Sequence, residues 1–161
     1  MTPISVGIVT VSDRASAGAY EDLGGPALVS QAKEFGWNVQ AEAIVPDEIT
    51  RIQDIVQALA AQGCQVILTT GGTGVAPRDR TPEAIRAIMR VELPGFGEIM
   101  RAESMKLTPN AILSRSLAAI VDRSLVIALP GKPAGAVDCL KFVAPAIPHA
   151  VKVAQGLPTS C

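Results

Sequence analysis

The 161-residue chain has few aromatic side chains and a net charge close to zero, and both features restrict the fold and the function that it can have. Aromatic residues make up 3% of the sequence, although 48% of it is apolar. The core must therefore consist of Val, Ile, Leu and Ala, which suits helices packed on a buried sheet. The net charge of −1 argues against a general nucleic-acid or membrane-surface binder, because such proteins carry a basic excess. No apolar run approaches the roughly 20 residues of a membrane span.

Histidine and cysteine are also scarce. His149 is the only histidine, which excludes a histidine-rich metal site, and we expect it in a surface or interface role. Any metal ion should then be a hard ion held by oxygen ligands. Cys64, Cys139 and Cys161 lack a Cys-x-x-Cys spacing, so we expect two buried thiols and one in a frayed C-terminus, in a reducing compartment. No signal-peptide pattern precedes Asp13, so the protein is expected to be cytoplasmic.

Strands and helices are predicted to alternate along a single domain, residues 1–161. Apolar runs indicate buried strands, and apolar residues at three- and four-residue spacing indicate amphipathic helices. Strand–helix–strand succession implies a mainly parallel sheet covered on both faces. The predicted fold is α/β, a three-layer α/β/α arrangement with a C-terminal β-hairpin. The expected strands are residues 4–11, 38–45 (near an edge), 65–68, 117–121 and 125–129; the expected helices are 26–35, 48–62, one from 81, 98–105, and one from 134 kinked or split by Pro145 and Pro148, with a loop at 12–25 and breaks at 93–97 and 108–110.

Four loops are predicted to leave the carboxyl ends of the parallel strands. Ligands of such sheets bind beyond those ends. The four loops hold most of the unusual polar and glycine content, so we expect a single site where they meet. They are residues 12–14, 46–48, 71–80 and 130–135.

The most informative stretch is residues 68–83, Leu-Thr-Thr-Gly-Gly-Thr-Gly-Val-Ala-Pro-Arg-Asp-Arg-Thr-Pro-Glu. Gly71, Gly72, Thr73 and Gly74 follow a buried strand, where their backbone N–H groups can form an anion-binding nest. The loop is not a P-loop, because no Gly-x-x-x-x-Gly-Lys-Ser/Thr occurs, and it lacks the third glycine of a dinucleotide fingerprint. A sharp turn alone would also use glycines, but this combination with a charged loop and a helix start favours a phosphate ligand.

Two aspartates, Asp47 and Asp79, fall near strand ends beside this loop. Asp47 has a simpler interpretation as a helix N-cap, which spacing alone favours, and Asp79 as a turn-forming residue. Both should nevertheless lie at the same sheet edge as the nest. Two carboxylates facing a polyphosphate are what a Mg²⁺ site for phosphoryl or nucleotidyl transfer requires. The cations available to balance the remaining phosphate charge are Arg14, Arg78, Arg80 and Lys132.

Two further polar features flank the predicted site. Thr81 can cap the helix that follows the glycine loop. Ser114 and Arg115, before the hairpin, can hold a second anionic ligand or cap their own loop, and the sequence does not separate these interpretations.

With these motifs the chain resembles the molybdopterin adenylyltransferases, a MogA-like family that includes the G domain of gephyrin. The resemblance covers nearly the whole chain, and it is most specific in Gly-Gly-Thr-Gly followed by Arg-Asp-x-Thr-Pro-Glu. The matching segments are residues 10–14 with Ser16, Gly18 and Asp22, then residues 45–48, 69–83, 94–101, 111–115 and 129–133.

The resemblance implies a homotrimer in which the terminal phosphate of molybdopterin attacks the α-phosphate of ATP. Mg²⁺ would be required, and the products would be adenylylated molybdopterin and pyrophosphate. A molybdenum insertase on another polypeptide would receive the product. The family's two critical aspartates map onto Asp47 and Asp79, which are the implied catalytic and metal-binding residues. The implied nucleotide-binding residues are Gly71, Gly72, Thr73, Gly74, Pro130, Gly131 and Pro133; the implied substrate-binding residues are Ser12, Asp13, Arg14, Ser114 and Arg115.

Two other classes of function stay open beside the enzyme. One is a non-catalytic molybdopterin-binding or scaffold module of the same fold, and the other is a nucleotide-dependent regulator with a different small acid as substrate. Asp47 and the Arg78–Asp79 pair favour the enzyme. Residues 94–100 and the last helix offer apolar material for the implied subunit contact. Lys132 occupies a variable position in Pro-Gly-x-Pro, which leaves its role open.

Overall fold

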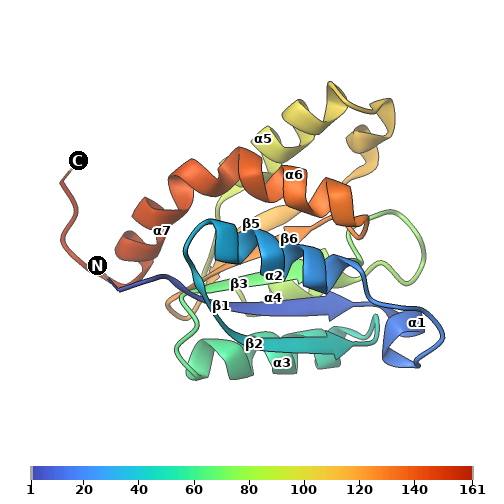
Figure 1. Cartoon of the computed structure of the whole chain (residues 1–161), viewed down its shortest axis with the longest axis horizontal. Helices are drawn as coiled ribbons and strands as arrows, with labels where there is room; N and C mark the ends of the chain where they lie inside the picture. The colour runs from blue at the N-terminus through green and yellow to red at the C-terminus, as the bar shows by residue number, and fades with distance from the viewer. Residues whose placement is uncertain (1, 161) are drawn as a thin grey trace.

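A six-stranded sheet forms the middle of the structure, a computed structural model that describes residues 2–160 (Figure 1). Its strands are β1 (Ser5–Val11), β2 (Asn38–Val45), β3 (Val66–Thr70), β4 (Val91–Glu92), β5 (Leu117–Val121) and β6 (Ser124–Leu129). Their order is β2-β1-β3-β6-β5-β4, so β2 lies at an edge as predicted. β1, β2, β3 and β6 run parallel, whereas β5 runs antiparallel to both neighbours. The mainly parallel sheet with a C-terminal hairpin is therefore confirmed.

The pairing register brings the carboxyl ends of the parallel strands level with one another. Thr70 of β3 lies opposite Thr10 of β1 and Leu129 of β6. The segments that follow these strands leave the sheet at one edge, where parallel sheets bind their ligands. Because β5 runs the other way, its first residue, Leu117, lies at that same edge.

Helices cover both faces of the sheet, which confirms the three-layer prediction (Figure 1). The single turn α1 (Asp13–Ser16) lies beyond the carboxyl end of β1. One face carries α2 (Gly24–Glu34), α5 (Pro94–Met105), α6 (Pro133–Val143) and α7 (Ile147–Ala154); the other carries α3 (Ile49–Ala61) and α4 (Thr81–Ile88); α1 spans Asp13–Ser16, and two 3-10 helices span Pro109–Leu113 (η1) and Ala144–Ala146 (η2).

Two apolar clusters, one on each face, hold the layers together. Along β3, Val66 and Leu68 belong to the cluster beneath α2 and α6, while Ile67 belongs to the cluster beneath α3 and α4. This alternation follows from the two-residue period of a strand. All three side chains are fully buried, and truncating Leu68 to alanine would cost about 2–5 kcal/mol. The sheet is thus a firm base for the loops at its carboxyl edge.

Several predicted boundaries are wrong, and at the start of α5 the reason is that proline can open a helix as well as break one. The expected loop at residues 12–25 contains α1, and α2 begins before Pro26, whose missing N–H costs nothing in a first turn. Pro94 likewise opens α5 where the sequence analysis expected a break. The short elements β4 and η1 were not predicted at all. The last helix is split as predicted, by η2 at Pro145.

The described cysteines and the single histidine lie where the sequence analysis places them. Cys64 and Cys139 are free and buried, and burial raises the pKa of each thiol. Cys161 lies outside the described residues. His149 is exposed on α7. Between residues 2 and 160, every helix is too short or too polar to cross a membrane.

Candidate functional site

Gly71 and Gly72 leave β3 in a loop that packs against the end of β1. Their φ angles are +106° and +70°, a region that favours glycine. A Cβ on Gly71 would overlap the carbonyl oxygen of Val11. A Cβ on Gly72 would overlap the Thr81 hydroxyl and lie 3.2 Å from Asp47 Oδ1. Glycine is therefore required here by the close approach of chain segments from three different strand ends.

Arg115 holds the outer part of the glycine loop. Its backbone N–H donates to the Thr73 carbonyl at 2.8 Å, and its guanidinium donates to the carbonyls of Gly74 and Asp79, each at 2.8 Å. The remaining guanidinium nitrogen, Nη1, pairs with the carboxylate of Glu83 on α4. Most of its donors are thus used on the protein itself. In this structure Arg115 shapes the loop, and a direct contact with substrate stays a prediction.

Thr81 holds the inner part of the loop and is not the predicted N-cap. The N-cap of α4 is Arg80, and no side chain caps this helix. The Thr81 hydroxyl instead donates to the Gly71 carbonyl at 2.9 Å, and its backbone N–H donates to the Gly72 carbonyl at 3.1 Å. The start of α4 is thereby fastened to the end of β3.

Asp47 is bonded reciprocally to Asp13, and it does not cap a helix. The Asp13 N–H donates to Asp47 Oδ2 at 2.8 Å, and the Asp47 N–H donates to Asp13 Oδ1 at 3.0 Å. The N-cap of α3 is Glu48, without a side-chain bond. Spacing alone therefore suggested the wrong role for Asp47. The pair fastens the loop after β2 to the loop after β1 and leaves Asp47 Oδ1 facing Gly72.

Asp79 lies on the outer part of the glycine loop, close enough to Asp47 for its charge to act on that carboxylate. Its Oδ2 accepts the Ala76 N–H at 2.8 Å, so the carboxylate does bond within its own loop, and a Cβ on Gly74 would lie 2.8 Å from the same oxygen. Burial raises the pKa of Asp47, and the charges of Asp13 and Asp79 raise it further. Two carboxylates from separate strand ends thus lie close enough for the charge of Asp79 to raise the pKa of Asp47, although the nearby Arg78 guanidinium lowers it.

Arg78 is committed to another carboxylate. Its Nε and Nη2 donate to the two oxygens of Asp13, both at 2.8 Å, and this bond lowers the pKa of Asp13. Arg78 therefore fastens the loop after β3 to the loop after β1. Its charge already balances that of Asp13, so less of it is left for the predicted role of balancing phosphate charge. Arg80 donates to the carbonyl of Pro77, and Lys132 is exposed.

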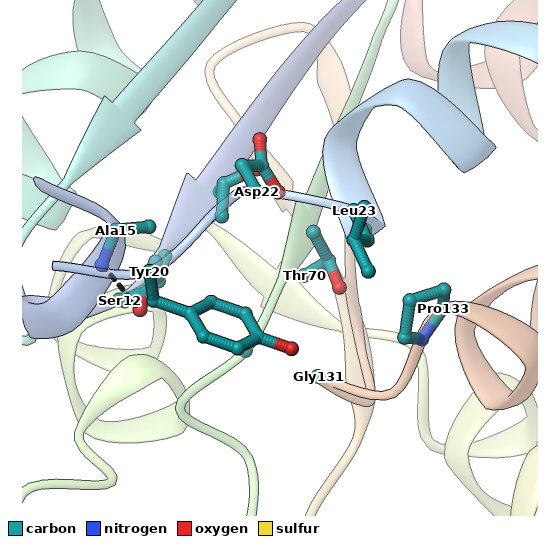
Figure 2. Close-up of a pocket in the computed structure, with 12 residues that line it drawn as sticks. Ser12, Ala15, Tyr20, Asp22, Leu23, Thr70, Gly131 and Pro133 are labelled. Atoms are coloured by element: carbon teal, nitrogen blue, oxygen red, sulfur yellow. Dashed lines mark hydrogen bonds between the residues drawn. The ribbon is translucent and has the colours of Figure 1, made fainter. Parts of the chain in front are cut away.

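The loop after β6 closes the site on the other side of Gly71. The Thr70 hydroxyl donates to the Pro130 carbonyl at 2.8 Å, and a Cβ on Gly131 would lie 3.5 Å from the Gly71 Cα. A hollow of about 140 Å³ lies between this loop and the segment after β1 (Figure 2). Of the predicted residues, it brings together Ser12, Gly71, Gly131 and Pro133.

A larger groove, of about 480 Å³, lies on the far side of the glycine loop. Thr73 and Gly74 form one wall, Ser114 another, and the Pro130–Lys132 segment a third. The Ser114 hydroxyl donates to the Ser116 hydroxyl at 3.1 Å, so a loop-capping role is also supported. Ser12 caps α1, accepting the Ala15 N–H at 3.1 Å.

The residues present suit a hard divalent cation. Within residues 2–160 no three His, Cys, Asp or Glu side chains gather to hold a metal ion. An ion here would rest on Asp47, Asp79 and the oxygens of its ligand, which matches the incomplete protein shell that Mg²⁺ accepts beside phosphates. Burial is the main cause of the raised pKa of Asp47, and the charges of Asp13 and Asp79 add to it, so a cation bound here would offset those charges.

Comparison with known proteins bears directly on this geometry. A family model described as a probable molybdopterin binding domain matches residues 7–149. The chain belongs to this molybdopterin-binding family.

Two named relatives of this family cover almost the whole chain. A molybdopterin adenylyltransferase of Helicobacter pylori J99 is 45% identical over 159 residues, 97% of this chain and 90% of that protein. Gephyrin of Dictyostelium discoideum is 39% identical over 96% of this chain, which corresponds to 23% of gephyrin. Among solved structures, the molybdopterin biosynthesis enzyme MoaB of Thermus thermophilus superimposes with a TM-score of 0.90 and 41% identity, covering 98% of this chain and 99% of that one.

Sequence reasoning about this member of the molybdopterin-binding family missed two kinds of residue. One is the residue that holds the glycine loop through partners distant in sequence, such as Glu83, which pairs with Arg115. The other is Tyr20, which lines the hollow beside Asp22. A polar segment that contains an isolated aromatic residue was the available signal, since exposed aromatics in loops are often ligand contacts.

Proposed function

We propose that the protein is a molybdopterin adenylyltransferase, which transfers AMP from ATP to molybdopterin and releases pyrophosphate during molybdenum cofactor biosynthesis. The observation that carries this proposal is that two carboxylates, Asp47 and Asp79, lie against Gly72 and Gly74 of the glycine loop, where a Cβ would crowd their oxygens. The names of the relatives support the same activity.

The reaction needs positioning more than covalent chemistry from the protein. An oxygen of the terminal phosphate of molybdopterin bonds to the α-phosphorus of ATP, and the bond from that phosphorus to the bridging oxygen breaks. Pyrophosphate leaves with the electron pair. The backbone of residues 71–74 and 130–133 is proposed to hold the nucleotide, while Ser114 and the larger groove are proposed to hold the pterin.

Asp47 and Asp79 are proposed to hold Mg²⁺, which would offset the charge of the triphosphate. The protein's own contribution is to fix both carboxylates. Asp47 is fixed by the Asp13 N–H, and Asp79 by the Ala76 N–H. Each keeps an oxygen outside these two bonds, which is the condition for binding a cation and a backbone donor together.

Substitution of either aspartate by asparagine tests the proposal. In Asp79→Asn and Asp47→Asn the amide oxygen still accepts the backbone N–H, so the fold should survive. With molybdopterin and Mg-ATP, pyrophosphate release should fall on the order of 100-fold, the usual scale for losing one preorganised electrostatic group. Asp54→Asn, on the exposed side of α3, is the matched control and should behave as the unsubstituted protein. Turnover near normal in Asp79→Asn would reject the metal-binding role.

A non-catalytic binding or scaffold role predicts a different result in the same assay. The protein would then bind molybdopterin without releasing pyrophosphate when Mg-ATP is added. The neighbouring carboxylates favour the enzyme, because a scaffold has no need of a half-buried carboxylate whose pKa is raised by burial and then by the like charges of Asp13 and Asp79.

We further propose that the protein works as a homotrimer in the cytoplasm and passes its product to a molybdenum insertase. Support for a subunit contact comes from an apolar hollow of about 310 Å³ between α5 and the end of α6, lined by Phe96, Ile99 and Phe142. Light scattering at micromolar concentration measures the assembly directly, and a monomeric mass would contradict it. The activated AMP product also requires a second enzyme that displaces AMP.

A further inference from the structure

Arg101 lies on α5, and none of the roles given above uses it. It ends residues 94–101, one of the segments that carry the resemblance to the family. Its side chain is half-buried, and its Nη1 donates to the Ser116 carbonyl at 2.8 Å, with the Ser114 carbonyl 3.5 Å away. Among residues 2–160, Arg101 forms no ion pair with a carboxylate. Its guanidinium is thus used on the main chain of one short segment.

Gly97 brings α5 close enough for this contact. A Cβ on Gly97 would lie 2.7 Å from the Ser116 carbonyl oxygen and 2.9 Å from Arg101 Nη2. No side chain fits at these distances, because either the helix or the segment would have to move. The helix therefore lies directly against the chain ahead of β5, where the guanidinium reaches the carbonyl.

The segment that Arg101 holds, residues 114–116, separates two hollows. Ser114 lines both the groove of about 480 Å³ beside the glycine loop and a hollow of about 290 Å³ on the α5 side. The Ser116 N–H donates to the Ser114 hydroxyl at 3.3 Å, and that hydroxyl donates to the Ser116 hydroxyl at 3.1 Å. The orientation of the Ser114 hydroxyl thus depends on Ser116, which is buried. A contact that fixes Ser116 also fixes Ser114 in the groove.

The neighbouring parts of the chain give this segment little other support from the α5 side. Upstream, Ile112 and Leu113 are 66% and 53% exposed, so they add little packing. Downstream, β5 begins only at Leu117. Arg115 holds the segment from the side of the glycine loop, through its N–H bond to the Thr73 carbonyl. Arg101 supplies the hydrogen bond from the opposite side.

We propose that Arg101 is a positioning residue for molybdopterin, which holds residues 114–116 so that the Ser114 hydroxyl faces the ligand in the groove. The proposal rests on the proposed function, in which Ser114 contacts the pterin. Arg101 itself lines the hollow on the α5 side and acts through the main chain. Its loss should weaken the binding of molybdopterin and spare that of ATP, because Arg115 keeps its own contacts with the glycine loop.

The variant Arg101→Met tests the proposal, because it removes the donor and keeps an unbranched side chain. The KM for molybdopterin should rise about tenfold, the usual scale for losing one oriented hydrogen bond, while kcat and the KM for ATP stay within about twofold. Equilibrium binding of molybdopterin without ATP should weaken by the same factor. A rise in the KM for ATP alone, or in neither KM, would overturn the proposal.

Arg86→Met is the matched control. Arg86 lines the same hollow as Arg101, but its Nε pairs with Glu92 at 2.9 Å. Its substitution also removes one positive charge from the hollow, and it should leave the KM for molybdopterin unchanged. If Arg86→Met weakens molybdopterin binding as much as Arg101→Met does, the effect comes from charge, and the positioning role is wrong.

A double substitution separates positioning from direct contact. Ser114→Ala should weaken molybdopterin binding about as much as Arg101→Met. If Arg101 acts through Ser114, adding Arg101→Met to Ser114→Ala should cause little further loss. Additive losses would mean that Arg101 contacts the ligand itself, which would refute the positioning role.

Gly97→Ala disturbs the same contact while Arg101 stays in place. Its Cβ would meet the Ser116 carbonyl and displace the segment, so it should raise the KM for molybdopterin even if Arg101→Met does not fold. Pyrophosphate release with an unchanged KM for molybdopterin in the folded variants would reject the role of Arg101 and keep the enzyme. Molybdopterin binding that depends on Arg101, without pyrophosphate release on adding Mg-ATP, would keep the positioning role and reject the proposed function.

Discussion

Replacing Arg115 by alanine should loosen the glycine loop more than it disturbs the rest of the fold. The guanidinium supplies two of the hydrogen bonds that hold the loop, to the carbonyls of Gly74 and Asp79, and it pairs with Glu83. The backbone N–H bond to Thr73 does not depend on the side chain. The expected loss is therefore limited to the outer half of the loop.

The magnitude follows from the number of bonds and their exposure. A hydrogen bond from a charged donor contributes about 1.5–3 kcal/mol when buried. The Arg115 side chain is 32% exposed, so water recovers part of this on truncation. A total of about 2–3 kcal/mol is reasonable, which would lower the Tm of a chain of this size by about 5–10 °C.

Two matched variants separate the guanidinium geometry from its charge. Arg115→Lys keeps a positive charge near Glu83 but loses the planar fork that reaches two carbonyls, so it should lose nearly as much stability as Arg115→Ala. Glu83→Gln removes only the ion pair, and because Glu83 is 47% exposed the loss should stay within about 1 kcal/mol.

Urea unfolding measures these changes, and amide hydrogen exchange locates them. Exchange should accelerate at residues 71–80 in Arg115→Ala and Arg115→Lys, while the amides of β1 and β3 keep their protection. The Arg115 guanidinium does not hold the loop if the free energy of unfolding of Arg115→Ala is within about 0.5 kcal/mol of that of the unsubstituted protein. The same conclusion follows if Arg115→Lys is as stable as the unsubstituted protein.

Two further predictions concern stability. Because burial, with the charges of Asp13 and Asp79, raises the pKa of Asp47 above 3.8, the folded state binds its proton more tightly, and stability falls as pH rises through the folded pKa. Asp47→Asn should therefore unfold at higher urea concentration than the unsubstituted protein at pH 7, with the gap closing toward pH 3; a gap independent of pH would contradict the electrostatic cause. The buried Thr69 hydroxyl has no partner among the described residues, so Thr69→Val should raise the free energy of unfolding by about 1 kcal/mol, and a loss instead would point to a bound water.

The strands, and the sheet edge at which the candidate site lies, could be predicted because they depend on the local pattern of apolar residues. The apolar run that includes Val66, Ile67 and Leu68 marks a strand buried on both faces, and its parallel neighbours follow from the intervening helices. Once the strands are parallel, Asp47 and the glycine loop must emerge on one edge. The convergence of these loops needed no knowledge of side-chain contacts.

The contacts inside the site could not be predicted because their partners are far apart in sequence. Asp47 reads locally as an N-cap, and only the pairing of β1 with β2 brings it to Asp13. Arg78 resembles a solvated charge until the loop after β3 folds onto that same carboxylate. Pro94 carries the local signal of a helix break, yet nothing in its neighbourhood of sequence distinguishes a break from a first turn.

The reversed direction of β5 has a consequence for where this chain tolerates change in length. The segment ahead of β5, with Ser114 and Arg115, enters the sheet at the rim where every parallel strand exits, whereas the Asp122–Arg123 bend lies at the opposite rim. Extra residues in that bend would extend away from the hollow and the groove beside the glycine loop and would leave both intact. The same insertion just upstream of Leu117 would displace Arg115 and with it the outer half of the glycine loop.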